Sequence, residues 1–236
     1  MNEKSARLGV DIGGTFTDLV LEISGNSYST KVLTTYLAPE SAIIDGMMQV
    51  CSKAGISPLD ITQIIHGTTL ATNALIERRG AKTALITTEG FRDVIEMRTE
   101  SRFEQYDLNL CLPEPLLPRQ MRYTVPGRID ANGNELLPLF RQDVEKVVKK
   151  IKTAGYESIA IGLIHSYAND IHEKLVRDVV SELIPDAMIS ISSEVSPQMR
   201  EYERFNTVVA NAYIKPLIKS YLDRLKGKLK EVGADC

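Results

Sequence analysis

The stretch that decides the fold is "VDIGGTFTD" (Val10–Asp18), in which two aspartates bracket a glycine pair and two threonines. Apolar residues alternate before the glycines, at positions 8, 10 and 12, and resume after them at 19, 21 and 23. This alternation is typical of two strands joined by a short connection. We therefore expect a β-hairpin whose turn is formed by residues 13–15.

The glycines in this turn allow two interpretations. Gly-Gly often does no more than close a hairpin. A bare backbone, however, also lets N–H groups approach a phosphate closely, and Asp11 could hold Mg²⁺, which prefers oxygen ligands. The turn lacks the lysine of a P-loop and the GxGxxG of a Rossmann turn. The flanking aspartates and threonines favour the phosphate interpretation.

The composition bounds the protein class. The 236 residues carry a formal net charge of −3, and 43% of them are hydrophobic. A chain of this length can bury a substantial core, and its slightly negative charge gives no sign of the basic surface that binds nucleic acid. No apolar run approaches the roughly 18 residues of a membrane span, and the N-terminus lacks a signal-peptide core. The three cysteines, at positions 51, 111 and 236, form no CxxC pattern. We therefore expect a cytoplasmic protein without nucleic-acid or membrane partners.

The rest of the chain predicts alternating helices and strands. Expected helices cover residues 41–54, a segment begun by Thr68 or Thr69, 144–151, 171–183 and 198–230, the last kinked before Pro216. Expected strands cover residues 61–65, 82–88, 158–164 and 187–192, and a hairpin is expected at 130–134. Strand–helix–strand order in the second half implies parallel pairing with right-handed crossovers, hence an α/β fold.

Five segments carry a family resemblance. They are "GVDIGGTFTD" (9–18), "HGTTLATNALIERRGAKTALITTEGFRD" (66–93), "YDL" (106–108), "HSYANDIHE" (165–173) and "SSEVSPQMREYERFNTVVANAYIKP" (192–216). Together they resemble the N-terminal lobe of the hydantoinase A, 5-oxoprolinase and acetone carboxylase β-subunit family. That family is similar to the actin, Hsp70 and sugar-kinase ATPases, so an actin-like (ribonuclease H-like) lobe is implied, with an N-terminal antiparallel hairpin and later parallel βαβ units.

The resemblance implies ATP and Mg²⁺ as cofactors and a hydantoin or 5-oxoproline as the cyclic-amide substrate. The alternatives are a ketone-carboxylase subunit and a non-catalytic binding module that keeps the fold. Asp11 and Asp18 are carried over as catalytic residues, with Asp11 also holding the metal. The phosphate-binding positions carried over are Gly13, Gly14, Thr15 and Thr17.

Further residues have both a functional and a structural interpretation. His66, Gly67, Thr68 and Thr69 are carried over as a substrate-site element, against simple helix capping by threonine. Arg92 or Arg98 could approach a carboxylate substrate, although mixed charges more often form surface ion pairs. His165 and His172 lack a second ligand at metal spacing and are interpreted as structural. Glu201 and Arg204 are expected to pair on a helix.

The resemblance also implies a domain division. Residues 1–190 form the expected hydantoinase/oxoprolinase N-terminal domain, and residues 191–236 the truncated helical start of the hydantoinase A domain. We expect a first lobe that has little activity alone and needs a second lobe and a hydantoinase B-like subunit. An apolar face left open by the missing lobe would favour self-association into a homo-oligomer.

Overall fold

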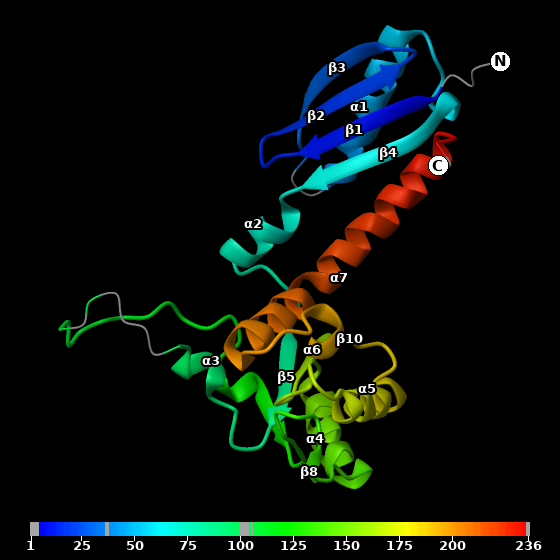
Figure 1. The fold of residues 1–236 in the computed structure, drawn as a ribbon. Helices are drawn as coiled ribbons and strands as arrows, with labels where there is room; N and C mark the ends of the chain where they lie inside the picture. Colours follow the sequence, from blue (N-terminus) through cyan, green and yellow to red (C-terminus); the bar gives the residue numbers. More distant parts are fainter. Residues whose placement is uncertain (1–4, 36–37, 100–103, 105, 235–236) are drawn as a thin grey trace. The chain divides into compact units, whose positions relative to one another are not determined.

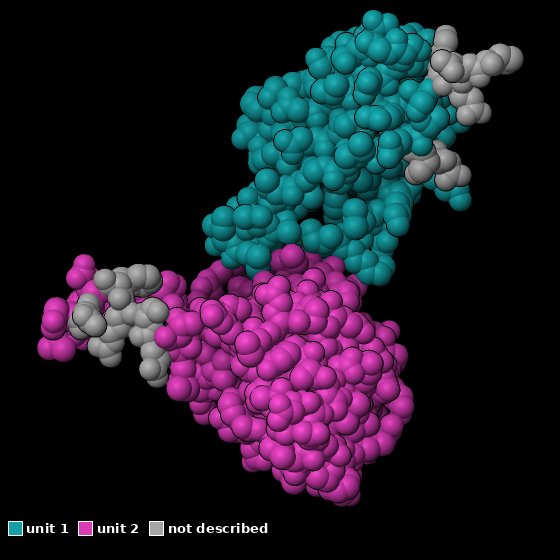
Figure 2. Space-filling model, in the orientation of Figure 1, with its two compact units in different colours: residues 1–77, 217–236 teal, residues 78–216 magenta. Residues whose placement is uncertain are grey.

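The computed structural model describes residues 5–35, 38–99, 104 and 106–234. It contains two compact units, coloured separately in Figure 2. Unit 1 comprises residues 1–77 and 217–236, and unit 2 comprises residues 78–216. The expected division at residue 190 concerns domains of the family rather than these units, and it stays a prediction.

Unit 1 is built on a four-stranded sheet with the order β3-β2-β1-β4 (Figure 1). Its strands are β1 (Ala6–Ile12), β2 (Phe16–Ile23), β3 (Asn26–Leu33) and β4 (Ile61–Thr68). β1 and β2 form the predicted antiparallel hairpin, β3 continues it, and β4 runs parallel to β1. β3 was not predicted, because its residues are mostly polar and only half-buried or exposed.

The two faces of this sheet differ. The core face packs against α1 (Pro39–Ala54) and the C-terminal part of α7 (Glu201–Glu231), with Leu8 opposite Leu21 and Val10 opposite Leu19. α1 approaches β2 so closely that a Cβ on Gly46 would lie 2.1 Å from a Leu19 methyl carbon. The alternate residues of β1 and β2, including both site aspartates, therefore lie on the other face.

Unit 2 contains a parallel sheet with the order β10-β9-β5-β6, which confirms the predicted α/β arrangement. Its strands are β5 (Thr83–Thr88), β6 (Arg122–Val125), β9 (Ser158–Gly162) and β10 (Met188–Ile191). β5 and β9 are buried along their whole length. α4 (Arg141–Ala154) and α5 (Ile171–Leu183) cover one face, and the N-terminal part of α7 and α3 (Val94–Met97) cover the other.

Short elements complete the fold. They are η1 (Pro58–Asp60), α2 (Leu70–Ile76), η2 (Arg119–Met121), β7 (Arg128–Ile129), β8 (Glu135–Leu137) and α6 (Ser192–Val195). β7 and β8 form the hairpin predicted at 130–134, in which the Asp130 carboxylate accepts the N–H groups of Asn132 and Asn134. α7 continues through Pro216. In the part of the chain that the structure describes, no helix is both long and apolar enough to cross a membrane.

Candidate functional site

The β1–β2 turn closes through Gly13. Its N–H donates to the Phe16 carbonyl at 2.9 Å, and its carbonyl accepts the Thr34 hydroxyl at 3.0 Å. A Cβ on Gly13 would lie only 3.0 Å from the Phe16 carbonyl oxygen. The hairpin itself therefore favours glycine at this position, in line with the structural interpretation of the glycine pair.

Gly14 is different, because the described chain gives no reason for a glycine there. A Cβ on Gly14 would meet nothing within 4 Å, and its φ is not positive. The N–H groups of Gly14 and Thr15 donate to no described residue. Two adjacent exposed backbone donors are an arrangement that suits an anion.

Thr17 supports the turn from its buried side. The side chain is fully buried, and its hydroxyl lies 2.9 Å from the Thr34 hydroxyl. Thr34 in turn donates its N–H to the Thr15 carbonyl at 2.9 Å. A contact between the Thr17 hydroxyl and a phosphate remains a prediction, and it would require this buried arrangement to open.

Asp11 and Asp18 lie directly opposite each other in the β1–β2 ladder. Like charges in this position repel, and Lys31 offsets the repulsion by forming an ion pair with Asp18 at 2.9 Å. Asp11 is exposed and forms no ion pair with any residue the structure describes. On its other side, Gly67 of β4 is its partner in the parallel ladder. Of the two carboxylates, Asp11 is therefore the one left to bind a cation.

This charge arrangement fits Mg²⁺ that arrives with a phosphate. Mg²⁺ keeps several waters and is commonly held by one or two carboxylates plus phosphate oxygens. Asp11 supplies one such carboxylate. Within the described ranges no group of three or more His, Cys, Asp or Glu side chains has the arrangement of a metal site. The residues therefore fit a nucleotide-borne metal better than a metal held by protein ligands alone.

His66 lies near the end of β4 and is held by Tyr221, a residue that no sequence pattern indicated. The Tyr221 hydroxyl lies 2.6 Å from His66 Nε2, and the tyrosine is 2% exposed. Burial lowers the pKa of His66, whereas the Val10 carbonyl and the Asp11 carboxylate act in the opposite direction. Desolvation raises the pKa of the Tyr221 hydroxyl, so it keeps its proton. The two positions are 155 residues apart in the sequence, so no local sequence pattern indicates this pair.

The two threonines after Gly67 have local partners. The Thr68 hydroxyl accepts the Leu70 N–H at 3.2 Å. Thr69, which directly precedes α2, makes no side-chain capping hydrogen bond, so the helix capping of the structural interpretation is not seen. The Thr69 hydroxyl and N–H each lie 3.4 Å from the Ile12 carbonyl. These contacts tie the end of β4 to the end of β1. The predicted substrate contacts of residues 66–69 remain predictions.

Arg92 belongs to unit 2 and contacts backbone rather than a carboxylate. One of its guanidinium nitrogens donates to the Arg119 carbonyl at 2.8 Å, while Arg119 forms a bidentate ion pair with Asp93. Arg98 donates to the Pro113 carbonyl. A nearby cavity of about 490 Å³ is lined by Arg98 and Arg119, but not by Arg92. A substrate contact of Arg92 remains a prediction.

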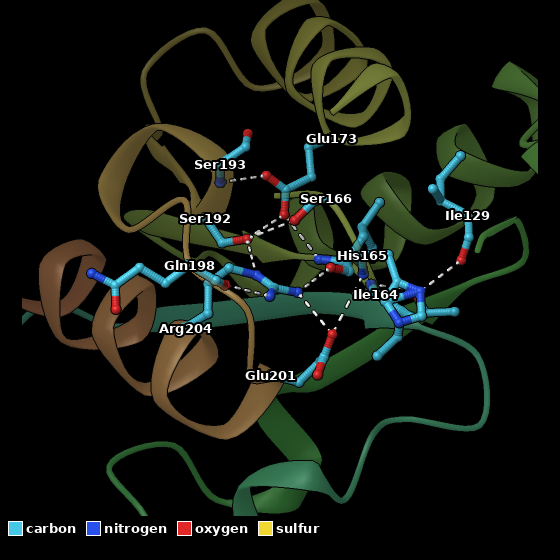
Figure 3. A network of polar contacts seen from close by, with 12 residues as sticks. Ile129, Ile164, His165, Ser166, Glu173, Ser192, Ser193, Gln198, Glu201 and Arg204 are labelled. Atoms are coloured by element: carbon cyan, nitrogen blue, oxygen red, sulfur yellow. Dashed lines mark hydrogen bonds and ion pairs between the residues drawn. The ribbon is translucent and has the colours of Figure 1, made fainter. Parts of the chain in front are cut away.

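A buried polar network joins α5, α6 and α7 in unit 2 (Figure 3). One oxygen of Glu173, a fully buried residue, accepts the Leu163 N–H at 2.9 Å and the Ser192 hydroxyl at 2.6 Å. Arg204, also fully buried, donates to Ser192 at 3.1 Å. The predicted pair of Glu201 and Arg204 is present at 3.4 Å. The burial of Arg204 was not predicted, because the mixed charges around it in the sequence are typical of an exposed helix face.

Comparisons with known proteins agree on one family. A family model described as "Hydantoinase/oxoprolinase N-terminal region" matches residues 7–184. Uncharacterized protein MJ0964 of Methanocaldococcus jannaschii is 42% identical over 232 residues, which cover 96% of this chain and 34% of that protein. Caprolactamase subunit alpha of Pseudomonas jessenii is 34% identical over 241 residues, covering 99% of this chain and 35% of the subunit.

Solved structures show the same likeness. The ATP-dependent caprolactamase of Pseudomonas jessenii superposes with a TM-score of 0.88, covering 98% of this chain and 34% of that one. Nucleotide-free acetone carboxylase, from work on ATP-dependent acetone carboxylation, superposes with a TM-score of 0.86 at 25% identity, covering 98% and 35%. The chain thus spans about a third of the length of these proteins.

Proposed function

The chain belongs to the hydantoinase/oxoprolinase N-terminal region family, and from this premise we propose that it binds the phosphates of ATP in an enzyme that hydrolyses cyclic amides. The caprolactamase relative, named as ATP-dependent, supports this assignment. Because the chain spans about a third of that relative, the proposal assigns the complete reaction to a longer assembly.

The observation that carries the proposal is the turn at Gly14. Its two exposed N–H groups, from Gly14 and Thr15, lie three to four positions from Asp11, the carboxylate that forms no ion pair with a described residue. In our proposal the backbone donors bind phosphate oxygens, and Asp11 holds Mg²⁺ directly or through water. Asp18, paired with Lys31, serves to set the local charge rather than to contact the metal.

The chemical task of such a site is positioning. A cyclic amide has a poorly electrophilic carbon, and phosphorylation of its oxygen creates a good leaving group. Phosphoryl transfer needs little covalent help from protein side chains, so the turn contributes by orienting the terminal phosphate and stabilising its charge. Bound Mg²⁺ would neutralise further phosphate charge. The hydroxyls of Thr17 and Thr34 stabilise the turn by contacting each other, and Thr34 also donates to the Gly13 carbonyl.

A ketone-carboxylase subunit is the second candidate, favoured by the likeness to acetone carboxylase. In both cases we propose a second lobe and a partner subunit, since the caprolactamase relative is itself named as a subunit. We also propose a cytoplasmic location, based on the free Cys51 and Cys111; Cys236 lies outside the described residues. Self-association of the chain also remains a proposal.

Calorimetry with Mg-ATP tests the proposal on the protein expressed from its complete gene. We expect Asp11→Asn to weaken Mg-ATP binding by about tenfold or more, because a charged ligand contact is lost. The matched control is Asp45→Asn, the same change at an exposed position of α1. Equal affinity of wild type and Asp11→Asn would refute the assignment. ATP hydrolysis stimulated by a cyclic amide, or instead by acetone with bicarbonate, separates the two candidates.

A further inference from the structure

His165 lies at the carboxyl edge of the unit 2 sheet, three positions after β9 ends at Gly162. The adjoining Ile164 N–H donates to the Thr88 hydroxyl at the end of β5 at 3.1 Å, so the loops after β5 and β9 meet here. The chain leaves β5 toward β6 on one side and leaves β9 toward β10 on the other. Open α/β sheets bind ligands at such a switch point.

The imidazole of His165 is held in one tautomer. Its Nδ1 lies 3.1 Å from the Ile129 carbonyl oxygen, and Figure 3 shows the ring turned toward that group. A carbonyl oxygen can only accept, so Nδ1 carries the hydrogen. The lone pair of the neutral ring is therefore on Nε2. The Tyr167 ring packs edge-on against the imidazole, with centroids 6.0 Å apart.

The Nε2 atoms of the three histidines differ in their partners, although the buried Nδ1 of His66 also lacks a hydrogen bond to a described residue. His66 Nε2 is bonded to Tyr221 and His172 Nε2 to Glu135, each at 2.6 Å. His165 Nε2 forms no hydrogen bond with a described residue and is not among the buried atoms that lack a partner. It is therefore an acceptor with a fixed direction that is open to solvent.

The backbone of His165 is strained, and side chains of α7 hold it in place. Its φ of 56° is left-handed, a conformation that costs energy for residues other than glycine and is often kept at functional sites. Its N–H lies 3.5 Å from a Glu201 carboxylate oxygen, and Arg204 holds the same oxygen at 3.4 Å. The buried network described above thus holds the residue that carries the open acceptor.

We propose that His165 Nε2 accepts a hydrogen bond from the ring N–H of a cyclic amide and orients it at this sheet edge. The choice of ligand rests on the proposed function, which supplies the substrate class. The N–H matters because Nε2 in this tautomer offers no hydrogen of its own. N-methylation of the amide should therefore weaken its binding here by about tenfold, as expected for one lost hydrogen bond.

Chemical modification tests this on the protein expressed from its complete gene. Diethyl pyrocarbonate acylates accessible unprotonated imidazole nitrogens, and peptide mass spectrometry resolves the three histidines. We expect His165 to react first, with His66 and His172 as internal controls. With Mg-ATP present, caprolactam and 5-oxoproline are each compared with their N-methyl forms, and hydantoin, which has two ring N–H groups, with its 1,3-dimethyl form. At least one parent amide should protect His165, and its N-methyl form should protect about tenfold less well.

Three results would overturn the proposal: His165 reacts no faster than the controls, no parent amide protects it, or the N-methyl form protects equally. His165→Asn adds a binding measurement, since asparagine tolerates a left-handed φ. This variant should lose about tenfold in affinity for the protecting amide while Mg-ATP affinity is unchanged. Failure of Mg-ATP to bind in an Asp11-dependent way would instead refute the proposed function, and the two failures are thereby distinguished.

Discussion

Replacing Gly14 by alanine separates what the hairpin needs from what a ligand needs. The added methyl group meets nothing within 4 Å in the described chain, and the φ of Gly14 is already accessible to alanine. Stability should therefore be unchanged or rise by about 0.4–1 kcal/mol, because alanine reduces the entropy of the unfolded chain. If a phosphate lies against the Gly14 and Thr15 N–H groups, the methyl group displaces it from one charged hydrogen bond. That loss is worth about 1.5–3 kcal/mol, or about 10- to 150-fold in affinity.

Two measurements on the same samples decide the outcome. Thermal unfolding reports stability, and calorimetry with Mg-ATP on the protein expressed from its complete gene reports affinity. Gly227→Ala is the matched control: it lies on α7 in unit 1, and its added Cβ also meets nothing within 4 Å. That variant should gain stability through helix propensity and keep its affinity. If Gly14→Ala binds Mg-ATP as tightly as wild type, the turn does not hold the phosphates.

Three further measurements test the contact between His66 and Tyr221, the buried network of Glu173 and Arg204, and the titration of His66. Tyr221→Phe removes the hydrogen-bond partner of His66 Nε2 and should lower the free energy of unfolding by about 1–3 kcal/mol, measured by chemical denaturation; an unchanged midpoint would contradict the contact. Arg204→Met leaves the Glu173 network without its buried cation and should cost about 3–5 kcal/mol, whereas a loss below about 1 kcal/mol would argue against a stabilising role. Because burial lowers the pKa of His66, its contribution to stability should be complete above about pH 6.5 and fall as the pH decreases below that value. NMR titration should place the His66 pKa below about 6.5, and a higher value would refute the reasoning.

Much of the fold followed from local pattern. Strict alternation around the glycine pair predicted the β1–β2 hairpin, and strand–helix–strand order predicted the parallel sheet of unit 2. These signals work because one buried face imposes a period of two on a strand, and a crossover helix forces its strands to be parallel. β3 escaped prediction because its alternation is weak: Tyr28, Thr30 and Val32 are only half-buried, and the residues between them do not differ sharply from them in polarity.

The candidate sites were predictable only where their residues are close in sequence. Asp11 and the turn after it lie in one short stretch, so their proximity was visible at once. Lys31 beside Asp18 and Tyr221 beside His66 come from other elements, and only the sheet register and the path of α7 bring them together. The free acceptor on His165 was missed for a different reason: which nitrogen is bonded depends on the Ile129 carbonyl, and no residue type records that.

The discontinuous composition of unit 1 has a consequence for biosynthesis. The core of unit 1 includes Tyr221 and Leu225, which leave the ribosome only after all of residues 78–216 have been made. Unit 2 is contiguous, so it can fold while the chain is still growing. The core of unit 1, in contrast, cannot be completed until α7 has been made. A nascent chain stalled before residue 217 would carry one finished unit and one sheet still lacking part of its cover, a species that chaperones would be expected to bind.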